Sequence, residues 1–479
     1  MIEFRRKPGD KKRGSGFIFG LTFFLFWLSS MALSQTAVRV SVQTLSNGLQ
    51  LIIDQNPYSQ TTAVFILIKG GKLADPQGKA GLGYLVARLS LDPPDTDFLK
   101  ELMKSGAEIR VASRGDFLLV SLECLSSQFD STMKLIYRTF SRPIFSGLRL
   151  NNLKEALKNY QKKELDDIDS RADLALLEAF FGSSPYGLSG YGHQLSIENL
   201  KSEDASSYHR KYFVGANIIM SVVSSLEPDA IKTVVESTFG RLPKGESFST
   251  EFPSWKLPEK KEIKIKKETP SSLLAAAFPL PSLSARSYVL ANFLDAIVGG
   301  GPGSKIWPLR SEEGLAYEVG SRLILMKGGS LFIIYLKTLA EKTAEARARF
   351  QEKLKEIENS GLNEDDLEMG RNCFRLWLYQ QFEAKIKKAE LQANFRALEI
   401  DYDLAEDSLE AFINKIKLPD LSEFFKEVFS LEKSVFLEII PSGNDLTVER
   451  NQPGLLFWPG PDKQAEYLQI PDRWTCFHL

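Results

Sequence analysis

Apolar residues follow two different periods along the first half of this chain. Alternating or wholly apolar runs predict strands at residues 48–53, 63–68, 108–112, 117–125 and 217–225. Runs that repeat every three to four positions predict helices at residues 81–89, 94–105, 127–140, 147–166, 170–181, 202–213 and 228–239. Because strands cluster apart from helices, the pattern predicts an α+β unit, with a mostly antiparallel sheet and helices on one face.

A stretch rich in proline, glycine, serine and charged residues, residues 241–260, then breaks this pattern. Such a composition is typical of a linker between domains. Residues 260–267 follow, in which Ile263 and Ile265 alternate with lysine and glutamate. A basic binding patch is one interpretation of this run, but a strand with one solvated face explains the alternation better.

The second half of the chain repeats the first. Residues 197–201 match residues 413–417 at an offset of 216, and residues 218–223 match residues 434–439 at the same offset. Agreement at one offset, at the same place in a helix–strand pattern, indicates two copies of one α+β unit. We therefore expect domains at residues 37–245 and 263–445. A linker at residues 246–262 joins them, and an extension without its own core follows at residues 446–479.

The first residues carry a targeting signal. Arginines and lysines between positions 5 and 13 precede an apolar run at residues 17–28 and a small-residue site at residues 32–34. This order predicts a secretory signal peptide over residues 1–36. The apolar run is shorter than the roughly 20 residues of a spanning helix, which favours cleavage over an uncleaved anchor. Either way we expect the globular part outside the cytoplasm, in the periplasm of a bacterium, tethered to the inner membrane only if the segment is retained.

The net charge and the small numbers of histidines and cysteines argue against several functions. The net charge of −1 carries no nucleic-acid signal. The chain has three histidines, none within helical reach of another, which makes a histidine-based zinc site improbable. Its three cysteines form no C-x-x-C motif, which argues against a zinc ribbon or a redox dithiol. We expect Cys124 and Cys373 to be small buried hydrophobic residues.

A strand pair, a glycine-rich loop and a helix at residues 81–89 follow one another near the start of the first unit. This order resembles the N-terminal domain of the insulinase-like (M16) metallopeptidases. In that family the helix carries the inverted zinc motif His-x-x-Glu-His. Here the matching positions hold Tyr84, Ala87 and Arg88, so neither an imidazole nor a carboxylate remains. The helix therefore cannot bind zinc or activate water as it does in active relatives.

The third zinc ligand of the family is a glutamate on a later helix. Alignment by the Pro-Tyr-Gly run at residues 185–187 places Tyr160 close to that position. Glu164 lies nearby, among lysines, and we expect it to be a solvated helix residue. One carboxylate without two imidazoles would not hold zinc in any case.

The better preserved motif lies in the second unit. It is similar to the M16 second-domain signature, with a small-residue loop at residues 299–303, then Leu309-Arg310 and then Gly314-Leu315-Ala316-Tyr317. The resemblance implies that Arg310 and Tyr317 face the substrate and help to hold its backbone and the charge that develops at its carbonyl. The alternatives are a surface salt bridge for Arg310 and a core position for Tyr317. The loop lacks the spacing of a phosphate-binding loop, and a helix C-cap is its minimal interpretation.

The resemblance covers about residues 40–445. It implies two homologous LuxS/M16-peptidase-like domains that form a clamshell around a cavity. Short bacterial members often act as heterodimers, in which one chain supplies the zinc helix and the other supplies the arginine and tyrosine. This chain is then expected to be a secreted, catalytically silent subunit that pairs with a zinc-bearing M16 homologue. It would add Arg310 and Tyr317 to a shared proteolytic chamber for peptides.

The same resemblance implies that this chain binds no cofactor and that zinc is held by the partner. The alternative function is a non-enzymatic scaffold subunit of an envelope or respiratory complex, because core subunits of respiratory complexes keep this fold without proteolysis. A peptidase with a different metal site is a third hypothesis, which the shortage of histidines disfavours.

Overall fold

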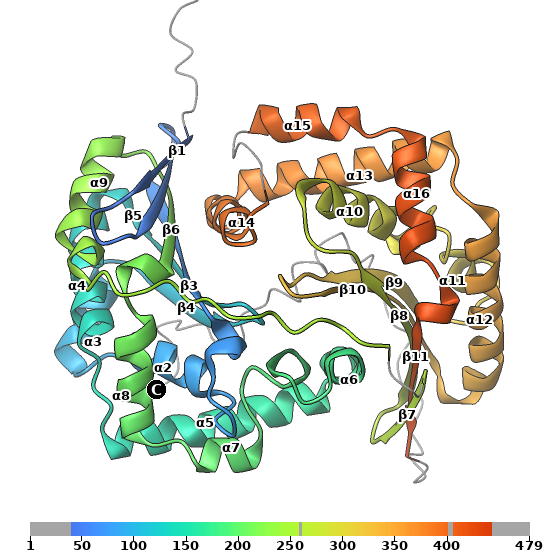
Figure 1. The fold of residues 1–479 in the computed structure, drawn as a ribbon, viewed down its shortest axis with the longest axis horizontal. Helices are drawn as coiled ribbons and strands as arrows, with labels where there is room; N and C mark the ends of the chain where they lie inside the picture. The colour runs from blue at the N-terminus through green and yellow to red at the C-terminus, as the bar shows by residue number, and fades with distance from the viewer. Residues whose placement is uncertain (1–39, 258–260, 401–405, 443–479) are drawn as a thin grey trace, which may run out of the picture. The chain divides into compact units, whose positions relative to one another are not determined.

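The computed structural model describes residues 40–257, 261–400 and 406–442 (Figure 1). The predicted signal peptide and the predicted C-terminal extension lie outside these residues. None of the described helices is long and apolar enough to cross a lipid bilayer.

The first half builds a six-stranded sheet in the order β1-β2-β6-β3-β5-β4. Its strands are β1 (Val40–Thr44), β2 (Gln50–Gln55), β3 (Thr61–Lys69), β4 (Glu108–Ser113), β5 (Phe117–Leu125) and β6 (Ile218–Ser224). Its helices are α2 (Leu82–Leu89), α3 (Thr96–Lys104), α4 (Phe129–Ser141), α5 (Gly147–Asp166), α6 (Ile168–Phe181), α7 (Gln194–Glu198), α8 (Ser202–Tyr212) and α9 (Pro228–Ser237).

The second half builds a five-stranded sheet in the order β7-β11-β8-β10-β9. Its strands are β7 (Glu262–Lys267), β8 (Ser271–Leu280), β9 (Glu318–Ile324), β10 (Ser330–Leu339) and β11 (Val435–Pro441). Its helices are α10 (Ala285–Gly299), α11 (Pro308–Ser311), α12 (Thr343–Ser360), α13 (Glu364–Glu383), α14 (Lys385–Ala397), α15 (Glu406–Lys415) and α16 (Leu418–Val428). On β7 the isoleucines are half-buried and the alternate residues exposed, as the sequence predicts.

The two sheets repeat one topology. After β1, the order β2-β6-β3-β5-β4 corresponds strand by strand to β7-β11-β8-β10-β9. Each sheet has one parallel pair among its described strands, β2 with β6 and β7 with β11, and the other pairs are antiparallel. The caps repeat too, because Asp204 accepts from the N–H of Lys201 in α8 and Asp420 accepts from Lys417 in α16. The predicted α+β class and the repeat are therefore confirmed, while the exact limits of the two domains stay a prediction.

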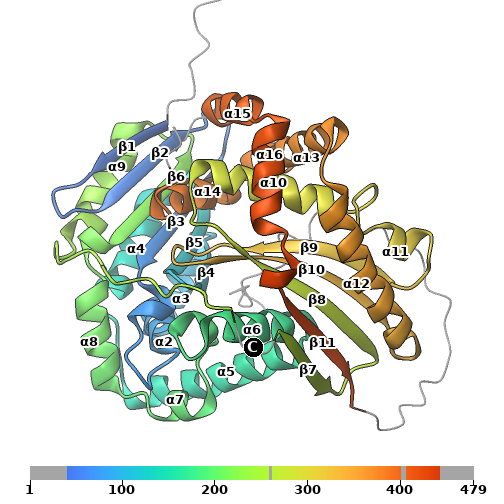
Figure 2. The same ribbon diagram turned by 45° about the vertical axis from the view of Figure 1, so that its right-hand side comes forward.

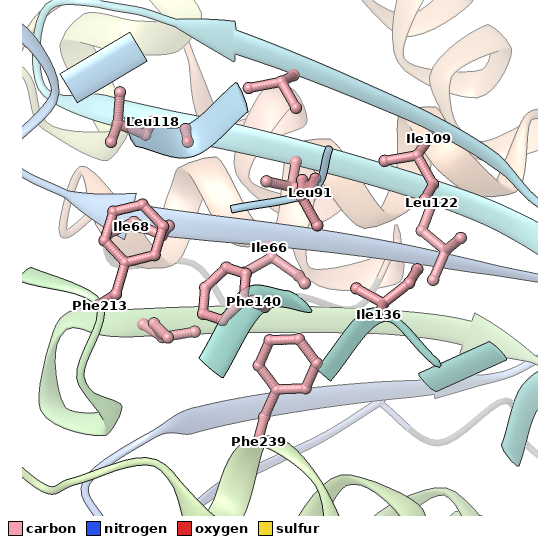
Figure 3. Packing of buried hydrophobic residues seen from close by; sticks show 14 of the residues in the cluster. Ile66, Ile68, Leu91, Ile109, Leu118, Leu122, Ile136, Phe140, Phe213 and Phe239 are labelled. Carbon is pink, nitrogen blue, oxygen red and sulfur yellow. The ribbon is translucent and has the colours of Figure 1, made fainter. Parts of the chain in front are cut away.

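One face of each sheet carries helices of its own half. On the first sheet, alternate strand residues such as Ile66, Ile68 and Leu122 turn towards α4, where Ile136 and Phe140 lie (Figure 3). The strand period of two places every second side chain on this face. Burying each large apolar side chain contributes about 1.5–3 kcal/mol, so this layer supplies much of the stability of the first half.

The other face of each sheet is covered by one helix from the opposite half (Figures 1 and 2). Ala389 and Ala393 of α14 lie against Phe65 of β3 on the first sheet. Reciprocally, residues of α6 such as Leu176 lie against the apolar residues of β8, β10 and β11, including Ala275. The sequence predicts helices on one face only, so this exchange of α6 and α14 is a feature that it does not reveal.

Charged side chains pin the exchanged helices to the sheets. Lys388 of α14 pairs with the fully buried Asp54 of β2 at 2.8 Å. Arg322 of β9 donates through Nε to Asp173 of α6 at 2.8 Å. Removing one partner of a buried pair leaves an uncompensated charge, so substitution of either partner is expected to destabilise the docking of these helices.

The two described cysteines differ from each other. Cys124 is buried, as predicted, and burial raises the pKa of its thiol to about 11. The prediction for Cys373 is wrong, because this residue is exposed on α13. Its neighbour Phe374 takes the inward position on that helix and joins the core of the second half.

Candidate functional site

Helix α2 starts at a cap that the loop before it provides. Both carboxyl oxygens of Asp75 accept backbone hydrogen bonds there, from Gly81 at 2.8 Å and from Gly83 at 2.7 Å. Gly81 has a φ of 93°, a conformation that favours glycine, and a Cβ on Gly83 would lie 2.6 Å from the Tyr208 hydroxyl. The helix is thus built against α8 without space for larger residues at its first turn.

The three zinc-motif positions lie on this helix and point into different surroundings. Tyr84 is 1% exposed and Ala87 is fully buried in the core of the first half. Arg88 is half-buried and lies near Asp92. Burial raises the pKa of the Asp92 carboxyl, and Arg149 and Arg88 oppose this rise. The position of the motif glutamate is therefore part of the apolar core, and the position of the second histidine holds a cation.

Three tyrosines form one aromatic cluster where the zinc ligands of active relatives are expected. The ring of Tyr84 stands edge-on to Tyr160 of α5 at 6.4 Å and to Tyr191 at 5.2 Å. Tyr160 and Tyr191 also pack against each other at 5.7 Å. Such ring pairs stabilise by about 0.5–1.5 kcal/mol beyond their buried area. Tyr84 and Tyr160, the two positions predicted from the family pattern, come together. Tyr191 joins them from a loop, and no motif in the sequence predicts this contact.

This set of residues does not fit zinc. A guanidinium donates hydrogen bonds and carries a positive charge, so it cannot ligate a cation. Neutral phenols packed ring against ring are poor substitutes for imidazole and carboxylate ligands. The two described histidines lie elsewhere, since His193 caps α7 and the His209 ring bonds the carbonyl of Phe140. Among residues 40–257, 261–400 and 406–442, no group of His, Cys, Asp or Glu is placed to hold a metal ion.

The expectation that Glu164 is solvated is wrong. Its side chain accepts a hydrogen bond from the Ser189 hydroxyl, and burial raises the pKa of its carboxyl. The reason is tertiary: the loop after α6 folds over this turn of α5. Lys72 lies in the same buried region, where it donates to the carbonyls of Leu188 at 2.6 Å and Tyr186 at 3.3 Å.

Burial is the largest cause of the pKa shifts in this polar cluster. It lowers the pKa of Lys72 to about 8, against the opposing effects of Glu164, Asp116 and Asp75. It raises the pKa of Asp75 to about 7, against the hydrogen bonds from Gly83 and Gly81. Asp116 accepts from the Lys327 backbone N–H of the second half at 2.9 Å. The cluster therefore joins α2, α5 and the β9–β10 turn, and no sequence motif predicts it.

Arg310 and Tyr317 lie on the connection between α10 and β9. The guanidinium of Arg310 stacks over the ring of Trp307 at 4.9 Å, and no described carboxylate forms an ion pair with it. Tyr317 is 48% exposed, and its hydroxyl donates to the Ser271 hydroxyl at 3.1 Å. The loop before them ends α10, with Gly301 and Gly303 at positive φ, as the C-cap interpretation predicts.

The two constellations belong to different cores. Leu82 and Leu85 of α2 pack in the core of the first half, whereas Leu309 and Leu315, which flank Arg310, pack in the core of the second. Figures 1 and 2 show α2 and α11 on opposite sides of the ribbon. Within one chain, Arg310 and Tyr317 therefore do not complete the tyrosine cluster on α2.

Two family models match consecutive parts of the chain. Residues 50–192 match the model described as insulinase (peptidase family M16), and residues 199–373 match the model described as peptidase M16 inactive domain. Together the matches include α2 and the segment that carries Arg310 and Tyr317.

Similar proteins include non-peptidases. An uncharacterized zinc protease of Rickettsia felis is 22% identical over 85% of this chain and 98% of its own length. A non-peptidase homolog, YmxG, of Helicobacter pylori is 22% identical over 66% of this chain and 75% of its own length.

Solved structures show the same fold. A peptidase M16 inactive domain from Pseudomonas fluorescens superposes with a TM-score of 0.76 at 17% identity, over 85% of this chain and 99% of that chain. A chain of complex III2 from Candida albicans superposes with a TM-score of 0.71 at 16% identity, over 84% and 96%.

Proposed function

The chain belongs to the insulinase-like (M16) family as a non-catalytic member, and from this premise we propose that it is the silent subunit of a heterodimeric zinc peptidase. It pairs with a zinc-bearing M16 homologue and contributes Arg310 and Tyr317 to a shared chamber for peptide substrates. The zinc and the general base both come from the partner.

One observation supports this proposal above the others. Tyr317 is 48% exposed and Arg310 is half-buried with no ion pair to a described carboxylate, whereas other arginines of the same half, such as Arg286 and Arg347, form ion pairs. Arg322 is the contrast, since it is buried and bonded to Asp173. A side chain that served only the fold would be expected to resemble Arg322 rather than Arg310.

The chemistry of the pair fits a peptide carbonyl. A guanidinium is a fixed fork of donors that suits a carbonyl oxygen or an oxyanion, and a phenol can donate to the same oxygen. Removing one such donor from a hydrolytic site typically costs about 3 kcal/mol of transition-state stabilisation. Zinc held by the partner would supply the activated water. The residues of this chain would bind and orient the peptide and would stabilise the charge on its carbonyl oxygen.

The separation of α2 from α11 supports a partner chain. Arg310 and Tyr317 are flanked by residues of a different core from that of α2, and in this proposal they act on the zinc helix of the partner chain. In our proposal the two chains pair outside the cytoplasm, on the basis of the predicted signal peptide at residues 1–36.

A scaffold without proteolysis is the second candidate. The likeness in fold to a chain of complex III2 is the observation that favours it. A scaffold has no need of the pair Arg310 and Tyr317, so the two hypotheses differ in the effect of substituting these residues.

The test is co-purification with the zinc-motif homologue of the same organism. We expect zinc and hydrolysis of a quenched fluorescent peptide library only when the homologue is present. Arg310→Ala or Tyr317→Phe in this chain should each lower kcat about 100-fold. The matched controls are Arg286→Ala, at a surface ion pair, and Tyr58→Phe, at a side chain 93% exposed.

Three results would contradict the proposal. Activity of this chain alone would mean that the tyrosine cluster is not silent. Equal activity of Arg310→Ala and Arg286→Ala in the heterodimer would remove the proposed role of Arg310. A stable complex without peptidase activity, unaffected by either substitution, would favour the scaffold.

A further inference from the structure

We infer that Ser271 is a positioning residue for Tyr317, and that its hydroxyl both aims the phenol and strengthens it as a donor to the substrate oxygen. This inference rests on the proposed function. Ser271 is the first residue of β8, far from Tyr317 in the sequence, and no motif singles it out.

The contact spans one end of the second sheet. Ser271 pairs with Leu339 at the end of β10, and Tyr317 precedes β9 on the other side of β10. The Tyr317 hydroxyl donates to Ser271 Oγ at 3.1 Å across this end. A side chain 48% exposed would otherwise rotate between rotamers, so this hydrogen bond selects the orientation of the phenol.

The backbone of Tyr317 is held independently of its side chain. Its N–H donates to the carbonyl of Lys337 at 3.0 Å. The next residue, Glu318, accepts from the Tyr335 hydroxyl at 3.2 Å and pairs with the Lys337 ammonium at 3.3 Å. Lys337 in turn pairs with Asp169 of α6 at 2.5 Å. With the Cα fixed in this way, the remaining freedom of Tyr317 is in its ring, which Ser271 restrains.

Ser271 is anchored as well. Its N–H donates to the Thr269 hydroxyl at 3.4 Å, and the same hydroxyl donates to the Ser271 carbonyl at 3.2 Å. This small turn at the start of β8 keeps Ser271 Oγ within reach of the phenol.

The protons explain why a hydroxyl is needed at position 271. The phenol has one proton, which it gives to Ser271 Oγ in the free protein. When a peptide carbonyl arrives, the phenol turns its proton to that oxygen. The Ser271 hydroxyl can then rotate and donate its own proton to the phenol oxygen. A donor that also accepts a hydrogen bond is polarised and donates more strongly. No bond other than these hydrogen bonds changes.

The experiment uses the heterodimer and the quenched peptide library. Ser271→Ala should lower kcat about fivefold, the effect of one ordinary neutral hydrogen bond, with KM unchanged to within about twofold. Ser271→Thr keeps the hydroxyl and should restore most of the loss. Ser247→Ala, at an exposed serine of the linker, is the matched control and should leave kcat unchanged.

A positioning role also predicts non-additivity. In a Tyr317→Phe background, Ser271→Ala should cause no further loss, because the phenol through which it acts is gone. The melting temperature and the yield of heterodimer should be the same for Ser271→Ala and the unsubstituted chain.

The outcomes separate this inference from the proposed function. If Tyr317→Phe lowers kcat while Ser271→Ala behaves as Ser247→Ala, only the role of Ser271 is overturned. If Ser271→Ala lowers kcat equally in the presence and absence of the Tyr317 hydroxyl, the effect is structural and the inference is wrong. If Tyr317→Phe has no effect, the role of Tyr317 fails and that of Ser271 fails with it.

Discussion

The tyrosine cluster on α2 and the Arg310–Tyr317 segment lie in different copies of the repeated unit, and their surroundings differ. Tyr84 is 1% exposed and holds two other rings, whereas Tyr317 is 48% exposed and touches a hydroxyl at the edge of a sheet. In the first half, a site that has lost its metal ligands has been filled as core. In the second half, the Tyr317 side chain is exposed to solvent.

This difference indicates which side chains selection for the fold alone can explain. Burying Tyr84 stabilises the first half, so its presence needs no ligand. An exposed phenol and an unpaired guanidinium contribute little to stability. Folding alone therefore explains Tyr84 better than it explains Arg310 and Tyr317.

The largest expected effect comes from returning a carboxylate to the zinc motif. Ala87→Glu would place an unpaired charge in the core of the first half, where Ala87 is fully buried. We expect a loss of about 3–5 kcal/mol in the free energy of unfolding, measured by urea denaturation. The control is Ala344→Glu, at an exposed helical alanine of α12, with a change within about 0.5 kcal/mol. Equal effects of the two substitutions would mean that the α2 site is open rather than filled.

The next test compares the two tyrosines directly. Tyr84→Ala removes a ring that two neighbours pack against and should cost about 3–5 kcal/mol in the free energy of unfolding. Tyr317→Ala should change the free energy of unfolding by no more than about 0.5 kcal/mol. Under the proposed function, the same substitution should lower the peptidase activity of the heterodimer. Urea denaturation of both variants measures the difference. A large loss for Tyr317→Ala would favour the core interpretation of that residue.

The third test concerns a pH dependence at the cap of α2. Burial raises the pKa of Asp75 from an ordinary value of 3.8 to about 7. Because the folded state binds the proton more tightly, the stability from Asp75 is present below pH 3.8 and is lost as the pH rises to about 7. Lys72 and the Tyr208 hydroxyl face the same carboxyl but titrate above this window.

Asp75→Asn should therefore flatten the pH dependence of the free energy of unfolding between these two values. Urea denaturation across the range, beside Asp95→Asn at the exposed cap of α3, measures it. An unchanged slope in Asp75→Asn would show that Asp75 is ionised throughout and that the cap is as strong at neutral pH as in acid.

Local patterns predict most of the fold and only part of the candidate site. The strand and helix periods and the repeat offset are confirmed by two sheets of one topology. The burial of Glu164 and the exposure of Cys373 were mispredicted, since an apolar period shows which side of a helix turns inward but not what lies over its polar side. Tyr191 and Ser271 could not be found from spacing, because each reaches its partner only through long-range contacts.

The sequence by itself determined which chemical groups the chain carries and in what order they occur. The absence of imidazole and carboxylate at Tyr84, Ala87 and Arg88 excludes the zinc chemistry of the family in any conformation of that helix. Only the tertiary structure decided which of these side chains are buried and what they contact. It brought three tyrosines into one cluster, exchanged α6 and α14 between the halves, left Tyr317 exposed and stacked Arg310 on Trp307. The physical reason is that burial depends on surfaces contributed by distant segments, which no local pattern encodes.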